Sequence, residues 1–264
     1  MRTTLTIAGS DSIAGAGIQA DLKTFAALGV YGVSALTAIT AQDTDGVRDV
    51  VALSPEFVQA QIDAVAYDVE IAAVKTGMLA TADIVRVVAD RVRRIPRLKL
   101  VVDPVLVATG PRSRTLLAPD AVSVLKTNLL PAATVVTPNI AEAETLSGVR
   151  IQSLDQARDA ARRILDFGPA AVVVKGGHLA GPQAVDVLLH AGTFTEIEAT
   201  RVAVGDVHGT GCTFASAIAA RLALGDDIPS AVGHAKRYIT GAIEHSFEIG
   251  RGARVLNHFW ELSL

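Results

Sequence analysis

Short runs of apolar residues alternate along the chain with longer stretches whose apolar positions recur at helical spacing. The short runs are nearly continuous, which is typical of strands buried on both faces of a parallel sheet; they are Leu5–Ala8, Ala72–Val74, Leu100–Val102, Thr134–Val136 and Ala171–Val174. The stretches between them predict helices over Gly17–Leu28, Pro55–Ala66, Asp83–Arg94, Pro119–Leu129 and Leu154–Phe167. The alternation predicts an α/β fold with three layers, in which a doubly wound, mostly parallel sheet is covered by helices on both sides.

Two local signals refine this pattern. Ser54 stands directly before Pro55, which predicts a helix N-cap followed by proline at the first helical position. The segments Val185–Leu189 and Phe194–Ala199 flank an Ala-Gly pair, which suggests a local hairpin. No repeat, low-complexity tract or linker divides the chain, so we expect residues 1–264 to form a single domain.

Composition narrows the class of protein. Half of the 264 residues are apolar, so a substantial core is available and disorder is not expected. The formal net charge is −3, so the chain lacks the excess of basic residues that is typical of a nucleic-acid-binding protein. A single cysteine excludes an intramolecular disulfide, and no apolar stretch approaches the ~20 residues of a membrane span. The amino-terminal apolar run is too short for a secretory signal, so we expect a cytoplasmic protein with no membrane partner.

Glycine, proline and polar residues follow each of the five predicted strands. These clusters are Gly9–Ser12, Lys75–Met78, Asp103–Val105, Thr137–Asn139 and Lys175–His178. Each cluster alone is an ordinary turn. Because the carboxyl ends of parallel strands converge on the ligand crevice of an open sheet, together they predict a binding site.

A glycine-containing turn at residues 207–214 is the leading candidate for chemistry. Gly209 and Gly211 flank Thr210, and an alanine-rich run follows that predicts a helix. The free N–H groups of a helix start hold an anion and stabilise charge that develops in phosphoryl transfer. Cys212 lies in this turn, and the helix dipole is expected to lower its pKa. The alternative interpretation is a plain glycine loop with a small apolar thiol.

Two further positions suit phosphate chemistry. Asn139 and Glu142 stand three residues apart at a predicted helix start, so both side chains face one spot and offer the oxygen ligands that Mg²⁺ prefers. The same pair is also the pattern of a capping box. Lys175 ends an apolar strand before two glycines, where it either neutralises phosphate charge or is an ordinary sheet-edge charge.

Ring recognition has two candidates. Gln42 follows a further predicted strand, Tyr31–Ala41, and its amide presents a donor and an acceptor that match the edge of an aminopyrimidine or a pyridine substituent. Met78, at the end of another strand, is suited to pack on a flat ring. The alternatives are a loop glutamine and a core methionine. The chain lacks a Walker P-loop, and Ile13 and Ala14 disrupt any dinucleotide fingerprint, which disfavours both of those enzyme classes.

With these residues in hand, the chain resembles the hydroxymethylpyrimidine/phosphomethylpyrimidine kinases of thiamine biosynthesis, within the ribokinase-like superfamily. The resemblance extends over almost the whole chain and is carried by residues 6–12, 16–24, 40–42, 75–79, 102–105, 137–139 with 142–144, 174–178, 208–213 and 255–259. It implies ATP-dependent phosphorylation of 4-amino-5-hydroxymethyl-2-methylpyrimidine, with a second phosphorylation in many members. It also implies Mg²⁺ and a homodimer.

The resemblance assigns roles to particular residues. Gly209, Thr210, Gly211 and Cys212 form the anion hole, and Cys212 is nearest to the attacking hydroxyl. Asn139 and Glu142 organise phosphate and Mg²⁺, Asp103 is a second metal-site residue, and Lys175 lies along the phosphates. The residues that hold the pyrimidine are Gln42, Met78, Gly9, Asp11, Ala16 and Val105.

The sequence departs from the family pattern at two places. Ile13-Ala14 replaces a glycine run in the substrate loop, and Val207 stands where threonine is common. Either change weakens the second phosphorylation or broadens the accepted alcohol. The alternatives are a pyridoxal or pyridoxine kinase, less well a thiazole or sugar kinase, and a non-catalytic ligand-binding protein on the same fold.

Overall fold

A nine-stranded sheet forms the centre of the computed structural model, which describes residues 1–107, 116–177 and 183–262. Its strands lie in the order β3-β2-β1-β4-β5-β6-β7-β8-β9. Strands β2, β1, β4, β5, β6 and β7 are parallel, whereas β3, β8 and β9 pair antiparallel with their inner neighbours. Their bounds are β1 Thr3–Ser10, β2 Tyr31–Asp43, β3 Gly46–Ala52, β4 Ala73–Thr76, β5 Leu100–Val102, β6 Val135–Val136, β7 Ala171–Val174, β8 Gln183–His190 and β9 Thr193–Thr200.

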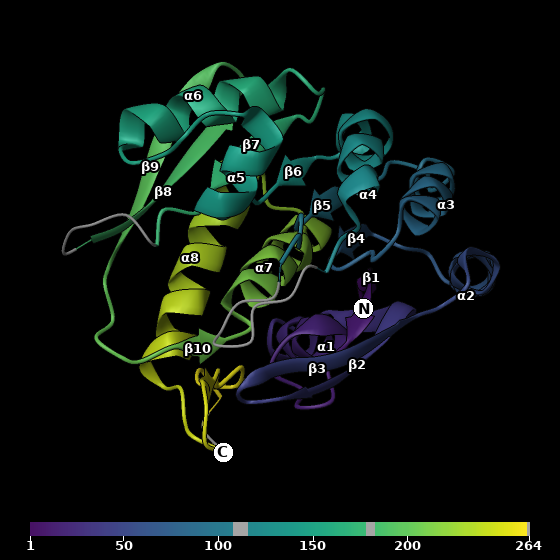
Figure 1. The fold of residues 1–264 in the computed structure, drawn as a ribbon, viewed down its shortest axis with the longest axis horizontal. Helices are drawn as coiled ribbons and strands as arrows, with labels where there is room; N and C mark the ends of the chain where they lie inside the picture. Colours follow the sequence, from purple (N-terminus) through teal and green to yellow (C-terminus); the bar gives the residue numbers. More distant parts are fainter. Residues whose placement is uncertain (108–115, 178–182, 263–264) are drawn as a thin grey trace.

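Helices cover both faces of this sheet, and each face has its own apolar core. One face carries α1 (Gly17–Ala27), α7 (Thr210–Leu224) and α8 (Ile228–Glu244), with α7 and α8 side by side (Figure 1). The other carries α2 (Pro55–Asp68), α3 (Ala82–Val92), α4 (Pro119–Val124), α5 (Ile140–Ser147) and α6 (Leu154–Leu165). The three-layer α/β prediction is therefore confirmed. None of the helices that the structure describes is long and apolar enough to cross a bilayer.

Most predicted elements are present. Strands β5 and β7 occupy the predicted residues, and β8 and β9 form the expected hairpin. The Ser54 hydroxyl accepts a hydrogen bond from the Phe57 N–H, as an N-cap should. The helix predicted over Pro119–Leu129 differs, because the α-helix ends at Val124 and continues as a π-helical turn over Leu125–Leu129.

The β2–β3 hairpin was not predicted. The strand expected over Tyr31–Ala41 is present as β2, but its own pattern does not signal the pairing with β3. Ile39 and Val51 are paired across the two strands, and both are exposed. The turn between the strands is held by the carboxyl-terminal segment, where the Ala253 N–H donates to the Thr44 carbonyl at 2.9 Å.

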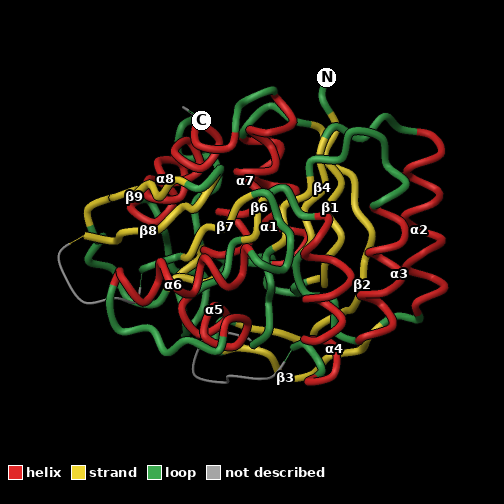
Figure 2. Tube along the Cα trace, turned by 90° about the horizontal axis from the view of Figure 1, so that it is seen from above, coloured by secondary structure: helices red, strands yellow, loops and turns green. Residues whose placement is uncertain are grey.

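The carboxyl ends of β1, β4, β5, β6 and β7, which are five of the six parallel strands (yellow in Figure 2), bring the predicted polar clusters to one edge of the sheet. One detail is corrected: β4 ends at Thr76, so Met78 lies in the following loop and does not end the strand. A two-stranded parallel ladder, β10 (Val207–His208) with β11 (Arg254–Val255), leads into α7 at the same edge.

Candidate active site

The turn before α7 has the geometry that its glycines predict. Gly209 is the N-cap residue with a φ of +85°, a left-handed conformation that favours glycine, and a Cβ there would collide with the Gly15 carbonyl. A Cβ on Gly211 would lie 3.2 Å from Lys175 Nζ and 3.7 Å from Asp103 Oδ2. The amides of the α7 first turn, which have no acceptor within the helix, therefore lie beside one cation and one carboxylate. The predicted helix start is confirmed.

Lys175 is held in place at this turn. Its Nζ donates to Asp103 Oδ1 at 2.9 Å, and the lysine side chain is 16% exposed. Burial lowers the pKa of Lys175, but Asp103 and Glu142 raise it more, so the pKa lies above its ordinary value and the ammonium stays charged. Lys175 is thus a partly buried cation at the amide turn, and the alternative of an ordinary sheet-edge charge is wrong.

Asn139 and Glu142 form the capping box that was one of the two interpretations. The Asn139 N–H donates to Glu142 Oε2 at 2.8 Å, and the Glu142 N–H donates to Asn139 Oδ1 at 2.9 Å. Burial raises the pKa of Glu142 to about 7; the Lys175 ammonium lowers it and Asp103 raises it. The carboxyl therefore lies within the electrostatic reach of the Lys175–Asp103 pair. In the described part of the chain, no three His, Cys, Asp or Glu side chains gather as a ready metal site.

The Cys212 thiol behaves differently from the prediction. Burial raises its pKa to about 11; Lys75 lowers the pKa, while Asp103 and Asp21 raise it further. The helix start was expected to lower the pKa, and that expectation is wrong in its net direction. Desolvation of the thiolate and two nearby carboxylates outweigh the helix dipole and the Lys75 charge. The thiol is therefore protonated at neutral pH.

A buried ion pair next to Cys212 was missed. Lys75 Nζ lies 2.8 Å from Asp21 Oδ1 and 2.9 Å from Oδ2, and neither side chain has exposed surface. The Thr6 and Ser216 hydroxyls also donate to Asp21, each at 2.6 Å. The available sequence signal was a lysine inside a buried strand, because a lysine there needs a partner.

A second unpredicted contact joins the substrate loop to the α7 turn. His208 Nε2 lies 2.9 Å from Asp11 Oδ2 and 2.9 Å from Gln42 Nε2. Asp11 also accepts from the backbone N–H groups of Gly15 at 3.0 Å and Ala16 at 2.8 Å. Burial raises the pKa of Asp11, but the His208 bond and the backbone bonds lower it more, so the pKa lies below its ordinary value.

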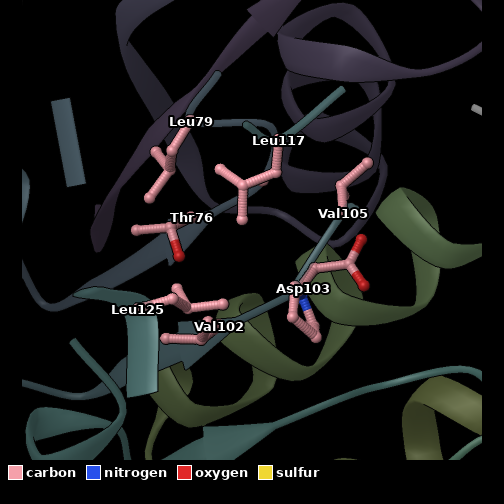
Figure 3. A pocket seen from close by; sticks show the side chains of 9 residues that line it. Thr76, Leu79, Val102, Asp103, Val105, Leu117 and Leu125 are labelled. Atoms are coloured by element: carbon pink, nitrogen blue, oxygen red, sulfur yellow. The ribbon is translucent and has the colours of Figure 1, made fainter. Parts of the chain in front are cut away.

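The other ring-binding candidates lie near these residues. A Cβ on Gly9 would be 2.6 Å from Met78 Cε, so the methionine packs directly over Gly9. Val105 and Asp103 line a small apolar hollow at the ends of β4 and β5, together with Thr76, Gly77, Leu79, Val102, Pro104, Leu117 and Leu125 (Figure 3). The structure thus brings Gly9, Asp11, Ala16, Gln42 and Met78 together, with Val105 beside Asp103.

The two departures from the family pattern have distinct settings. Ala14 has a φ of +59°, a left-handed conformation in which glycine is favoured, and its carbonyl accepts from Lys23 Nζ at 2.8 Å. Val207 is half-buried in β10. His178, which ended one sequence cluster, lies outside the described residues.

The fold and this edge of the sheet define a ribokinase-like small-molecule kinase, with an amide turn, a cation and a carboxylate arranged for phosphoryl transfer. The chain belongs to the phosphomethylpyrimidine kinase family, whose model matches residues 11–257.

Individual relatives agree with this membership. The chain is 49% identical over 259 residues to the hydroxymethylpyrimidine/phosphomethylpyrimidine kinase of Rhizobium meliloti, covering 97% of this chain and 96% of that one. It is also 49% identical over 254 residues to the thiamine biosynthesis bifunctional protein ThiED of Geobacter sulfurreducens, where 96% of this chain spans 51% of the relative. Among solved structures, the pyridoxal kinase from Staphylococcus aureus in complex with AMP-PCP and pyridoxal has a TM-score of 0.91 at 36% identity, covering 99% of this chain and 94% of that one.

Proposed function

We propose that this chain transfers the γ-phosphate of ATP to 4-amino-5-hydroxymethyl-2-methylpyrimidine, and to the monophosphate that results, in thiamine biosynthesis. The observation that carries the proposal is the amide turn of Gly209–Cys212 beside the Lys175–Asp103 pair. The name of the Rhizobium meliloti relative supports the pyrimidine as substrate.

The residues of the site have separate roles in the proposed phosphoryl transfer. The backbone N–H groups of Gly209, Thr210, Gly211 and Cys212 stabilise the charge on the transferred phosphoryl group. Lys175 neutralises phosphate charge, and Asn139 lies beside it, since the two are paired as an isolated parallel bridge. Cys212 faces the substrate hydroxyl, and its thiolate form accepts the proton of that hydroxyl to become the thiol. Positioning and charge stabilisation supply most of the rate enhancement, as expected for phosphoryl transfer.

Mg²⁺ fits the donors present. Asp103 and Glu142 are hard oxygen ligands within one electrostatic cluster, and Mg²⁺ usually takes one or two carboxylates, with waters and substrate phosphates as its other ligands. Two protein carboxylates near the phosphate site are therefore sufficient. When bound, the ion neutralises charge on the phosphate oxygens.

Substrate order tests the pyrimidine assignment. Because Gln42 and Met78 are suited to the edge and face of an aminopyrimidine, kcat/KM for the pyrimidine alcohol should exceed that for pyridoxal. Gln42→Ala should lower kcat/KM for the pyrimidine alcohol by about tenfold or more, the value of one lost hydrogen-bonded recognition group. Steady-state assays of ATP consumption with both alcohols measure this.

The second candidate is a pyridoxal kinase, favoured by the likeness to the Staphylococcus aureus structure with bound pyridoxal. An equal or reversed substrate preference in that assay would overturn the pyrimidine assignment in favour of pyridoxal. Absence of turnover with either alcohol would instead support a non-catalytic ligand-binding protein.

Glu142→Gln separates the catalytic role of this carboxyl from its cap. Glutamine still accepts the Asn139 N–H, so the helix start and the melting temperature should change little. If the carboxylate organises Mg²⁺ and phosphate, turnover should fall on the order of 10²-fold. Unchanged turnover at saturating Mg²⁺ in the folded variant would leave Glu142 with the capping role alone.

We also propose a homodimer and a cytoplasmic setting. Support for the dimer comes from the exposed apolar pair Ile39 and Val51 on the β2–β3 hairpin, since exposed apolar surface marks association sites. A single free thiol and dependence on ATP suit the cytoplasm.

A further inference from the structure

The orientation of the Gln42 side-chain amide does not match the hydrogen-bond donors and acceptors beside it. Gln42 Nε2 lies 2.9 Å from His208 Nε2, which itself lies 2.9 Å from Asp11 Oδ2. An ionised carboxylate is acceptor-only, so His208 Nε2 must carry the proton that Asp11 accepts. The Gln42 amide nitrogen then faces a second donor and gains nothing from that contact.

The other end of the amide shows the same conflict. The Thr40 hydroxyl lies 3.0 Å from the Ser10 carbonyl and 3.3 Å from Gln42 Oε1, and both oxygens are acceptors. A hydroxyl has one hydrogen, and the shorter contact to Ser10 takes it. Thr40 is therefore left with lone pairs directed at an amide oxygen.

Turning the Gln42 amide by 180° resolves both conflicts. Its oxygen then shares the single His208 Nε2 hydrogen with Asp11 Oδ2 in a three-centre bond, since both partners lie 2.9 Å from Nε2, and its nitrogen donates to Thr40 Oγ1. The oxygen and nitrogen ends of a side-chain amide have nearly the same shape, so the hydrogen-bond partners around the amide decide its orientation. Two independent neighbours, one a donor and one an acceptor, thus select the same orientation.

We propose that His208 is a positioning residue that locks the Gln42 amide with its oxygen toward the imidazole, and that this lock selects 4-aminopyrimidines over their 4-oxo analogues. The proposal rests on the proposed function. The locked amide retains one N–H and one lone pair. A 4-aminopyrimidine edge has a ring nitrogen that accepts and an amino group that donates, which complements them. The 4-oxo tautomer carries N–H and C=O in the same places, so it requires the opposite amide orientation.

The Gln42 backbone and the His208 ring are both held in place, so His208 acts on the torsion of the Gln42 side-chain amide. The Gln42 backbone is held on both sides by Ser12, whose hydroxyl donates to the Gln42 carbonyl at 2.7 Å and accepts from its N–H at 2.8 Å. His208 is fixed in turn: its backbone pairs with Val255 of β11, and its ring packs on Gly15, where a Cβ would lie 2.5 Å from Cδ2. A Gln42 side chain without His208 would turn to suit either ring.

The experiment compares kcat/KM and Kd for the 4-amino and 4-oxo pyrimidine alcohols across four variants. His208→Leu removes the donor, and the amino-over-oxo ratio should fall at least tenfold. His208→Gln places an amide N–H near the former Nε2 and should keep the ratio within threefold of wild type. Thr40→Val removes the acceptor at the other end and should also lower the ratio. Ser12→Ala removes only the two hydrogen bonds that hold the Gln42 backbone, so it should lower kcat/KM equally for both alcohols.

The outcomes separate this inference from the proposed function. No turnover of the amino alcohol by wild type would overturn the proposed function itself. Turnover by wild type with an unchanged ratio in folded His208→Leu would overturn the lock alone. Should His208→Leu fail to fold, Thr40→Val decides: a ratio lowered at least threefold supports the lock, and an unchanged ratio overturns it. A purely structural role for His208 would lower activity with both alcohols and leave the ratio as it was.

Discussion

Cys212→Ala should lower kcat by about 10²-fold or more, while the affinity for ATP stays within about threefold of wild type. The backbone N–H of residue 212 remains in the anion hole after this substitution, so phosphate binding does not depend on the thiol. The side chain acts separately, on the proton of the attacking hydroxyl. Single-turnover rates and nucleotide titrations of the folded variant measure the two effects independently.

The raised thiol pKa gives this prediction a pH signature. The thiolate is the form that accepts a proton, and burial raises the Cys212 pKa to about 11, so the thiolate is a minor form at neutral pH. Below that pKa its fraction grows with pH, and kcat should rise by nearly tenfold for each pH unit from about 7.5 to 9.5. Phosphate titrates near pH ~6, so the nucleotide contributes little to this slope.

Cys212→Asp is the matched control. A carboxylate at this position is ionised at neutral pH, so its rate should exceed that of the alanine variant and stay flat over the same pH range. A loose transition state needs little help from a base, which is the competing expectation. Rates of the folded alanine variant within about threefold of wild type, under ~0.7 kcal/mol of barrier, would show that the amides act without the thiol.

The elements that the sequence predicted well are those whose pattern is local. β5 and β7 are buried on both faces, so a continuous apolar run identifies them, and Ser54 signals a helix start by its own chemistry. The π-helical turn at Leu125–Leu129 has an apolar pattern that a regular helix would share. The β2–β3 hairpin was missed because the pairing of the two strands leaves no signal in either segment alone.

The site shows the same division. Lys175 follows a strand, and Gly209 and Glu142 stand at the starts of helices, so their positions at one edge of the sheet could be predicted from the sequence. His208 and Asp11 are 197 residues apart, and nothing in either segment indicates that they meet. The Cys212 pKa was predicted in the wrong direction because the helix start is visible in the sequence, whereas Asp21, Asp103 and the burial around the thiol are not.

The largest effect on stability is expected from the buried Lys75–Asp21 pair. Burial alone lowers the pKa of Lys75, but the charges of Asp21 and Asp103 more than offset it, so the Lys75 ammonium stays charged at neutral pH. Lys75→Met leaves a fully buried carboxylate whose remaining donors, among the residues that the structure describes, are the Thr6 and Ser216 hydroxyls. We expect the free energy of unfolding to fall by about 3–5 kcal/mol. Thermal denaturation should show a drop in melting temperature on the order of 10 °C.

The double variant Lys75→Met/Asp21→Asn separates folding from catalysis. A neutral amide at position 21 has one oxygen, which accepts from one of the Thr6 and Ser216 hydroxyls, while its nitrogen donates to the oxygen of the other, so removing both charges should restore much of the lost stability. Turnover should not return with it, because Lys75 lowers the Cys212 pKa more than Asp21 raises it, so that losing both charges makes the thiolate scarcer still. A folded double variant with wild-type kcat would mean that the pair serves the fold alone. A stable but slow variant, whose rate still climbs with pH, would place Lys75 in control of the thiol.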